Sequence, residues 1–213
     1  MFKALIFDMD GVLIDSEPLH KKIEQDILKE LGVNLPLEEH YQFASMGKIM
    51  WNIVEKRYGF NRKATADELH KEKAIRYLEA LTSKPILPIE GLEELLSDAK
   101  KKGLILAIAS SSSVHNIDLV VNALGIRSYF TVIVSGDHVS RNKPFPDIYL
   151  KAAELLNLMP EDCMVVEDSA NGVKAAKNAG MYCIGFNNPG SGNQDISPAD
   201  VIVNSLREVI NLI

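Results

Sequence analysis

Two acids near the start of the chain, Asp8 and Asp10, have the residue types and the spacing for catalytic chemistry. They follow an apolar run at residues 4–7 that is typical of a strand covered on both faces. Gly11 permits a sharp turn after them. Ligands of an open α/β sheet bind where its strands end, and two carboxylates this close need a cation or a retained proton.

The chemistry that this pair could perform follows from its oxygens. Carboxylates and carbonyls are suitable ligands for Mg²⁺, and Asp can also accept a phosphoryl group covalently. Alternatively, Asp8 and Asp10 could lie in an ordinary loop, where Asp residues only form turns and cap helices.

Four serines and one lysine could hold an anion. Residues 110–113 are all Ser and follow an apolar run at 104–109. Their hydroxyl and N–H groups could bind an anion at a helix start, although Ser is also an ordinary N-cap. Pro144 and Pro146 restrict the loop around Lys143. If its ammonium is fixed, Lys143 is a good counter-ion for a phosphoryl group. Alternatively, Lys143 is a solvated loop residue.

A second pair of acids, Glu167 and Asp168, follows the apolar run at 163–166. Asp168 or Ser169 could cap the next helix. The same acids could also complete a site for a hard cation together with the first pair.

The elements that must position these residues alternate along the chain. Apolar strand-like runs at 4–7, 104–109, 131–134, 164–166 and 182–186 are separated by helical patterns, such as the apolar face of 92–99 and the segment 170–179. This order predicts right-handed βαβ units and a parallel sheet. Only residues 16–83 lack a strand pattern, and we expect helices at 19–31, 50–58 and 66–81 within that insertion.

Composition restricts the class of protein. The formal net charge of -6, without a basic run, argues against a nucleic-acid partner. Cys163 and Cys183 lie in or beside apolar runs, so we expect buried, reduced thiols and a cytoplasmic location. We see no charged leader before an apolar segment and no apolar stretch approaching 18 residues, and therefore expect no export and no membrane span.

Together, four motifs in this order resemble the haloacid dehalogenase superfamily, and specifically its β-phosphoglucomutase and sugar-phosphatase branch. The motifs are Phe7-Asp8-Met9-Asp10-Gly11-Val12, Ala109-Ser110, Lys143-Pro144-x-Pro146-Asp147 and Glu167-Asp168-Ser169-x-x-Gly172. The resemblance spans the whole chain, and it implies a Rossmann-like α/β core at 1–15 and 84–213 with an inserted helical cap at 16–83.

The resemblance also implies roles for the residues of these motifs. Asp8 would be the nucleophile, and Asp10 would be the general acid and base with its main-chain carbonyl on Mg²⁺. Ser110, Ser111 and Lys143 would bind the phosphoryl group. Asp8, Asp10, Glu167 and Asp168 would form the Mg²⁺ site.

In the cap, the resemblance points to substrate-binding candidates at His20, Gly47, Lys48 and Lys73, each of which could instead have a structural or surface role. In the phosphoglucomutases an Arg lies three residues beyond the cap-loop Gly, where this chain has Met50. The Lys that follows their second-motif serine is Ser113 here.

We therefore expect a monomeric Mg²⁺-dependent phosphatase that hydrolyses a small phosphorylated metabolite, a sugar or sugar-alcohol phosphate, through an aspartyl-phosphate. The alternatives are a sugar phosphomutase and, from another class, a catalytically silent binding module on the same fold.

Overall fold

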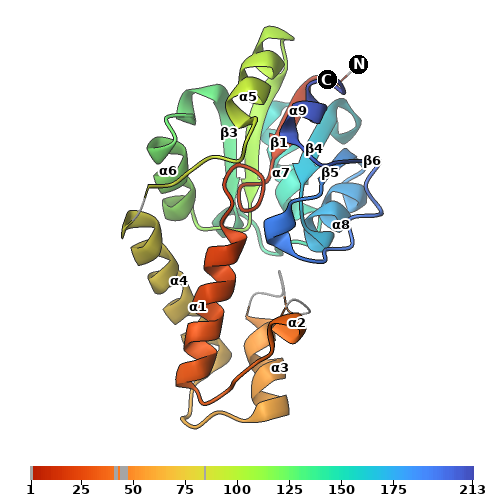
Figure 1. The fold of residues 1–213 in the computed structure, drawn as a ribbon. Coiled ribbons are helices and arrows are strands. Elements are labelled where there is room, and N and C mark those ends of the chain that lie inside the picture. The colour runs from red at the N-terminus through yellow and green to blue at the C-terminus, as the bar shows by residue number, and fades with distance from the viewer. Residues whose placement is uncertain (1, 41–42, 44–47, 84) are drawn as a thin grey trace. The chain divides into compact units, whose positions relative to one another are not determined.

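The chain divides into two compact units in a computed structural model that describes residues 2–40, 43, 48–83 and 85–213. An α/β unit comprises Met1–Asp15 and Ile86–Ile213, and a helical unit comprises Ser16–Pro85 (Figure 1). Each unit is described by itself below.

A parallel sheet forms the centre of the α/β unit, as predicted. Its strand order is β3-β2-β1-β4-β5-β6, which places β1 between β2 and β4. Phe7 pairs with Ile108 on one side and with Val166 on the other, so the ends of these three strands lie together. The strands are β1 (Ala4–Phe7), β2 (Ile105–Ser110), β3 (Phe130–Ser135), β4 (Cys163–Glu167), β5 (Tyr182–Phe186) and β6 (Val201–Val203).

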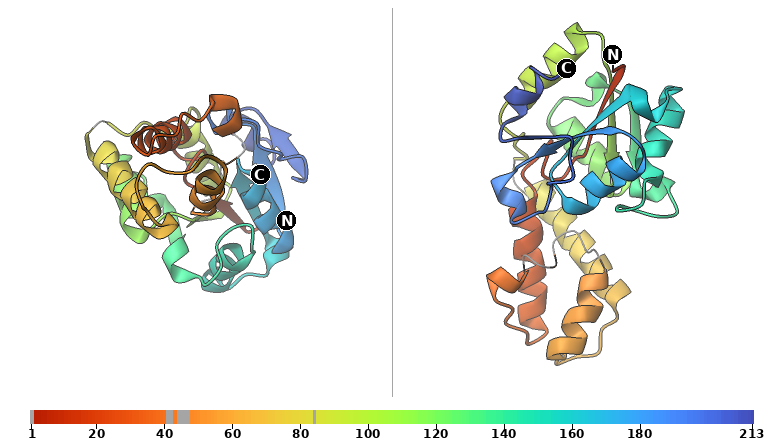
Figure 2. Two further views of the ribbon diagram at one scale, coloured as in Figure 1. Left: turned by 90° about the horizontal axis from the view of Figure 1, so that it is seen from below. Right: turned by 90° about the vertical axis from the view of Figure 1, so that its right-hand side faces the viewer.

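Helices cover both faces of this sheet. Figure 2 shows α7 and α8 on one face and α5 and α9 on the other. The apolar face predicted for 92–99 is buried in α5, because Leu92, Leu95, Leu96 and Ala99 share one side of that helix. The helices of this unit are α5 (Leu92–Lys101), α6 (Val114–Ala123), α7 (Asp147–Leu156), α8 (Ala170–Asn178) and α9 (Leu206–Val209), with 3₁₀ turns at Arg127–Tyr129, Gly136–His138, Pro160–Asp162 and Pro189–Ser191.

One part of the hydrophobic core lies between the sheet and the pair α7 and α8. Alternate residues of β1, Ala4 and Ile6, face it, together with Tyr149 of α7 and Cys183 of β5. Cys163 and Cys183 are both free and buried.

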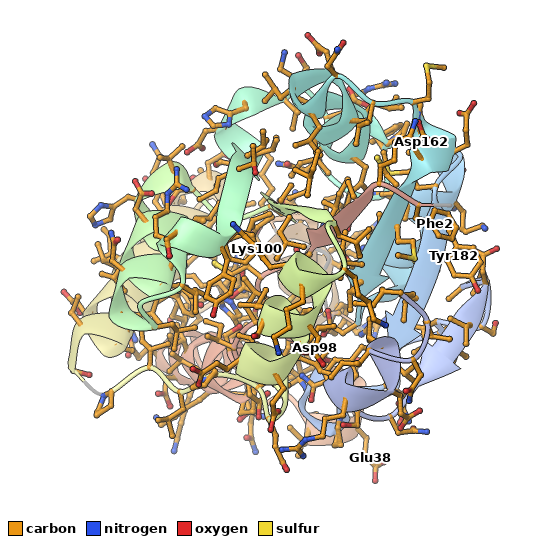
Figure 3. The ribbon with its side chains drawn as sticks, turned by 90° about the horizontal axis from the view of Figure 1, so that it is seen from above. Phe2, Glu38, Asp98, Lys100, Asp162 and Tyr182 are labelled. Atoms are coloured by element: carbon orange, nitrogen blue, oxygen red, sulfur yellow. The ribbon has the colours of Figure 1, made fainter. Side chains whose placement is uncertain are left out.

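Side chains at the amino-terminal end of β1 contact residues near the neighbouring strands. The rings of Phe2 and Tyr182 lie with their centroids 5.2 Å apart, and Lys3 Nζ lies 2.8 Å from Asp162 Oδ2 (Figure 3). These contacts stabilise the end of the sheet opposite to Asp8.

The helical unit consists of α1 (Glu17–Glu30), α2 (Leu37–His40), α3 (Ile49–Tyr58) and α4 (Ala66–Ser83). Both α1 and α3 pack against α4. The large side chains of Trp51 and Tyr77 are buried within the unit. In the described part of the chain, none of the helices has the length and apolar character that crossing a membrane requires.

Candidate active site

A buried ion-pair network connects Asp8, Lys143 and Glu167. Asp8 follows β1 directly, and Glu167 is the last residue of the neighbouring strand β4. Lys143 Nζ lies between them, 2.6 Å from Asp8 Oδ1 and 2.7 Å from Glu167 Oε1. The Lys143 side chain is only 7% exposed, so the fixed ammonium expected from the two prolines that follow it is observed.

The buried charges do not balance. Burial raises the pKa of Asp8 to about 8; the Lys143 ammonium opposes this rise, and the charges of Glu167 and Asp10 add to it. Burial on its own lowers the pKa of Lys143, but the charges of Asp8 and Glu167 outweigh this effect and raise it. One ammonium is therefore too little positive charge for the acids gathered here.

Asp168 lies beside this network and is held by the loop after β5. The hydroxyl of Ser191 donates a hydrogen bond to Asp168 Oδ2. In the same loop, Asn188 Nδ2 donates to the main-chain oxygen of Gly11 at 2.9 Å. Gly11 has a φ of +85°, and a Cβ there would lie 1.9 Å from Asp168 Oδ2. The turn after Asp10 therefore needs glycine for both its conformation and its close approach to Asp168.

The serines after β2 have different surroundings. Ser112 Oγ donates to Asp10 Oδ2 at 2.7 Å, and Ser112 N donates to Ser110 Oγ at 3.1 Å. Ser110 is buried and Ser111 is exposed. Ser113 caps α6 by accepting from Asn116 N at 3.3 Å. The run therefore combines a helix cap with groups that lie near the first pair of acids.

Asp8, Glu167 and Asp168 have the composition of a site for a divalent cation. All three are buried, and one carboxylate oxygen of each lies within 4.8 Å of the others. Oxygen ligands of this kind suit Mg²⁺, and the excess of buried negative charge favours a doubly charged ion.

The described substrate-binding candidates of the helical unit each contact another side chain of that unit. The ring of His20 stacks on that of Tyr77 with centroids 4.1 Å apart. Lys48 Nζ pairs with Asp67 at 3.0 Å on the surface. The side chain of Lys73 pairs with Glu24. Gly47 lies outside the described residues.

The sequence analysis did not single out Tyr149, Asn188 and Ser191, and it gave Ser112 no contact with Asp10. Ser112 belongs to the serine run, but its contact with Asp10 depends on how the chain turns after β2. Tyr149 OH donates to Glu167 Oε1 at 3.0 Å from within an apolar helix face. Asn188 and Ser191 lie in a loop whose Asn-Pro-Gly-Ser sequence indicates only a turn.

Comparison with known proteins agrees with this site. Residues 5–186 match the family of haloacid dehalogenase-like hydrolases, which covers most of the chain. The chain therefore belongs to the haloacid dehalogenase-like hydrolases, as its motifs predicted. It is a phosphoric monoester hydrolase of that family.

Three proteins illustrate the similarity. Hexitol phosphatase B of Escherichia coli (strain K12) is 32% identical, with 97% of this chain and 93% of that protein covered. A crystal structure of a CbbY mutant from Rhodobacter sphaeroides in complex with xylulose-(1,5)bisphosphate has a TM-score of 0.84 at 30% identity, covering 98% and 96% of the two chains. β-Phosphoglucomutase from Clostridium difficile has a TM-score of 0.80 at 26% identity, covering 98% and 93%.

The surroundings of Glu24 in the helical unit give a prediction for stability. His40 Nε2 lies 2.7 Å from Glu24 Oε2, and Lys73 pairs with the other oxygen of the carboxylate. Burial acts to raise the pKa of Glu24, but the Lys73 charge and the hydrogen bonds of His40 and Lys73 lower it from 4.5 to about 2. Because the pKa in the folded state is the lower one, the ionised carboxylate stabilises the protein above pH 4.5 and loses this effect as the pH falls toward 2.

We therefore expect Glu24→Gln to flatten the acid dependence of stability. As the pH falls from 4.5 toward 2, the free energy of unfolding should decrease more for the wild type than for the variant. The difference between the two decreases should be on the order of 3 kcal/mol. Urea titrations between pH 7 and pH 2.5 measure both. Glu79→Gln, at an exposed position of α4, serves as the control and should follow the wild type. Parallel curves for wild type and Glu24→Gln would contradict the prediction.

Proposed function

We propose that this protein is a Mg²⁺-dependent phosphatase that hydrolyses a sugar or sugar-alcohol phosphate through an aspartyl-phosphate. The observation that carries the proposal is the contact of Lys143 Nζ with Asp8 Oδ1 at 2.6 Å beside a buried acidic cluster. A carboxylate, an ammonium and a cation site in one place are what in-line phosphoryl transfer requires. The hexitol phosphatase and the CbbY complex with xylulose-(1,5)bisphosphate support the substrate class.

In the proposed reaction Asp8 is the nucleophile. Its oxygen attacks phosphorus while the bond from phosphorus to the ester oxygen breaks, and Asp10 gives a proton to the leaving alcohol. Asp10 then takes a proton from water as that water attacks the aspartyl-phosphate. Inorganic phosphate leaves, and Asp8 is a carboxylate again. Lys143 neutralises negative charge on the phosphoryl oxygens, and Ser110 and Ser111 bind the same group.

Mg²⁺ would be held by Asp8, Glu167 and Asp168 together with the main-chain carbonyl of Asp10. When bound, the ion would neutralise charge on the phosphoryl group and favour the ionised form of Asp8. Asp8 needs this help, because burial raises its pKa to about 8 in the absence of a metal.

We propose the helical unit as the cap that selects the substrate. His20, Lys48 and Lys73 are its candidates for substrate binding. Lys73 is a weaker candidate than its charge suggests, because its ammonium is already paired with Glu24.

The nucleophile is tested by two substitutions that keep the size of the side chain. Asp8→Asn should abolish turnover of phosphate esters, because an amide cannot form the aspartyl-phosphate. Asp10→Asn should slow both chemical steps by about 10²- to 10⁴-fold, because the acid and base help is lost. Release of inorganic phosphate from an aryl phosphate and from hexitol phosphates measures both. Near-normal activity of Asp8→Asn would refute the covalent mechanism.

Removal of the metal tests the cation. We expect excess chelator to stop turnover and Mg²⁺ to restore it. Mg²⁺ should also raise the melting temperature of the metal-free protein, because an ion that binds only the folded state stabilises it. Full turnover in chelator would exclude a role of the acidic cluster in metal-dependent catalysis.

The phosphomutase alternative makes a different product. A mutase must retain its bisphosphorylated intermediate in a closed site until a second sugar hydroxyl reacts. The residues that would grip the second phosphate are absent: the position of the Arg is Met50, which is buried, and the position of the Lys is Ser113, the cap of α6. Neither offers the bidentate contact of an Arg.

We therefore expect hydrolysis to exceed isomerisation. The measurement supplies β-glucose 1-phosphate with a trace of the bisphosphate and follows both inorganic phosphate and glucose 6-phosphate. Asp8→Asn is the control, and should form neither product. Glucose 6-phosphate accumulating much faster than inorganic phosphate would identify a mutase instead.

A further inference from the structure

The hydroxyl of Ser112 contacts the proposed general acid and base. Ser112 Oγ donates a hydrogen bond to Asp10 Oδ2 at 2.7 Å, although the two residues lie 102 positions apart in the sequence. They belong to the turns that follow the neighbouring strands β1 and β2. The other serines of the run have different tasks: Ser110 and Ser111 are the proposed ligands of the phosphoryl group, and Ser113 caps α6. The contact with Asp10 is therefore a separate feature of the run.

The main chain of Ser112 is fixed on both sides. Its N donates to Ser110 Oγ at 3.1 Å. Its carbonyl oxygen accepts from Ser135 Oγ at 2.7 Å and from Gly136 N at 3.2 Å. A serine whose backbone is already held by these three hydrogen bonds loses little further freedom when its hydroxyl binds a partner. The Ser112 hydroxyl is therefore a preorganised donor.

The end of β3 supplies two of these contacts. Ser135 is the last residue of β3, and it is buried. A Cβ on the next residue, Gly136, would lie 2.5 Å from the carbonyl oxygen of Ser111, so glycine permits the chain to approach the serine run this closely. An edge strand that carries none of the candidate catalytic residues thus fixes a residue that contacts one of them.

We propose that Ser112 is a positioning residue that aims the Asp10 carboxyl at the leaving group. This inference rests on the proposed function, in which Asp10 gives a proton to the leaving alcohol. A protonated carboxyl has one O–H donor, and its other oxygen is the better acceptor. Because Asp10 Oδ2 accepts from Ser112, the acidic proton belongs on Oδ1, and rotation of the carboxyl is restricted.

The proton balance of the first step defines the role of Ser112. The bond from phosphorus to the ester oxygen breaks as Asp8 bonds to phosphorus, and the proton of Asp10 Oδ1 moves to the ester oxygen. The proton of the Ser112 hydroxyl stays on its own oxygen throughout. An aimed donor matters most for a strongly basic leaving group, because such a group must take a proton as it departs. A weakly basic phenolate departs without this help.

Two aryl esters with different leaving groups test this role. 4-Nitrophenyl phosphate releases a weakly basic phenolate, whereas phenyl phosphate has a similar shape and releases a more basic one. The quantity compared is kcat/KM, because it covers the steps up to formation of the aspartyl-phosphate and excludes the later attack by water. The variants are Ser112→Ala, Ser112→Thr, Asp10→Asn and, as the matched control in the same run, Ser113→Ala.

We expect Ser112→Ala to lower kcat/KM for phenyl phosphate by about tenfold, which is part of the full effect of general acid catalysis, and for 4-nitrophenyl phosphate by less than about threefold. Asp10→Asn should show the same preference with a larger loss. Ser112→Thr keeps the hydroxyl, and Ser113→Ala affects only the cap of α6, so both should keep the wild-type ratio between the two esters.

Equal slowing of both esters by Ser112→Ala would overturn the proposal, since Ser112 would then bind the phosphoryl group or only support the fold. Circular dichroism melting curves identify any variant that fails to fold. Ser112→Cys, which keeps the size of the side chain and donates only weakly, replaces Ser112→Ala in that case.

A double variant tests whether Ser112 acts through Asp10. In the Asp10→Asn protein, adding Ser112→Ala should change kcat/KM for phenyl phosphate by less than about threefold, because the proton donor is already gone. Losses that multiply would contradict a role through Asp10.

The wild type separates this inference from the proposed function. A wild type that hydrolyses no phosphate ester would refute the proposed function and the role of Ser112 with it. If the wild type hydrolyses both esters and Asp10→Asn shows the dependence on the leaving group while Ser112→Ala does not, only the role of Ser112 is refuted.

Discussion

The structure of the site depends on the cost of burying several carboxylates close together. Asp8, Glu167 and Asp168 are all buried, and Lys143 supplies one positive charge among them. Like charges at this separation repel strongly where water is scarce. Each acid is therefore fixed by a different part of the α/β unit: Asp8 by Lys143, Glu167 by α7 and the start of α8, and Asp168 by the loop after β5.

The order of the strands brings the groups that stabilise these buried carboxylates to one edge of the sheet. Because β1 lies between β2 and β4, residues from the second half of the chain end beside Asp8. The main-chain N of Asp8 donates to Val166 O at 3.0 Å, which extends the strand pairing up to the proposed nucleophile itself. A residue on a paired backbone has little freedom to move, and a fixed geometry is what phosphoryl transfer needs. The protein thus gains rigidity at the site from the same hydrogen bonds that form the sheet.

Much of this architecture could be predicted from sequence. The runs 4–7 and 182–186 are strands with those bounds, and the helices predicted at 50–58 and 66–81 differ from α3 and α4 by one or two residues at an end. Strand β6 was missed because three residues carry too little pattern, and helix α2 because it has a single turn. The acids were singled out because charge directly after an apolar run is unusual, and Lys143 because Pro144 and Pro146 restrict its loop. The roles of Ser112, Tyr149 and Ser191 could not be found in this way, because each depends on a tertiary contact with a distant acid.

The sequence separation of these contacts also matters during synthesis of the chain. Lys143 follows Asp8 by 135 residues, and the hydroxyl that holds Asp168 belongs to Ser191. A nascent chain therefore carries Asp8 before it carries either the ammonium of Lys143 or the loop that holds Asp168. The contacts that organise the acids can therefore form only after Ser191 has been added to the chain.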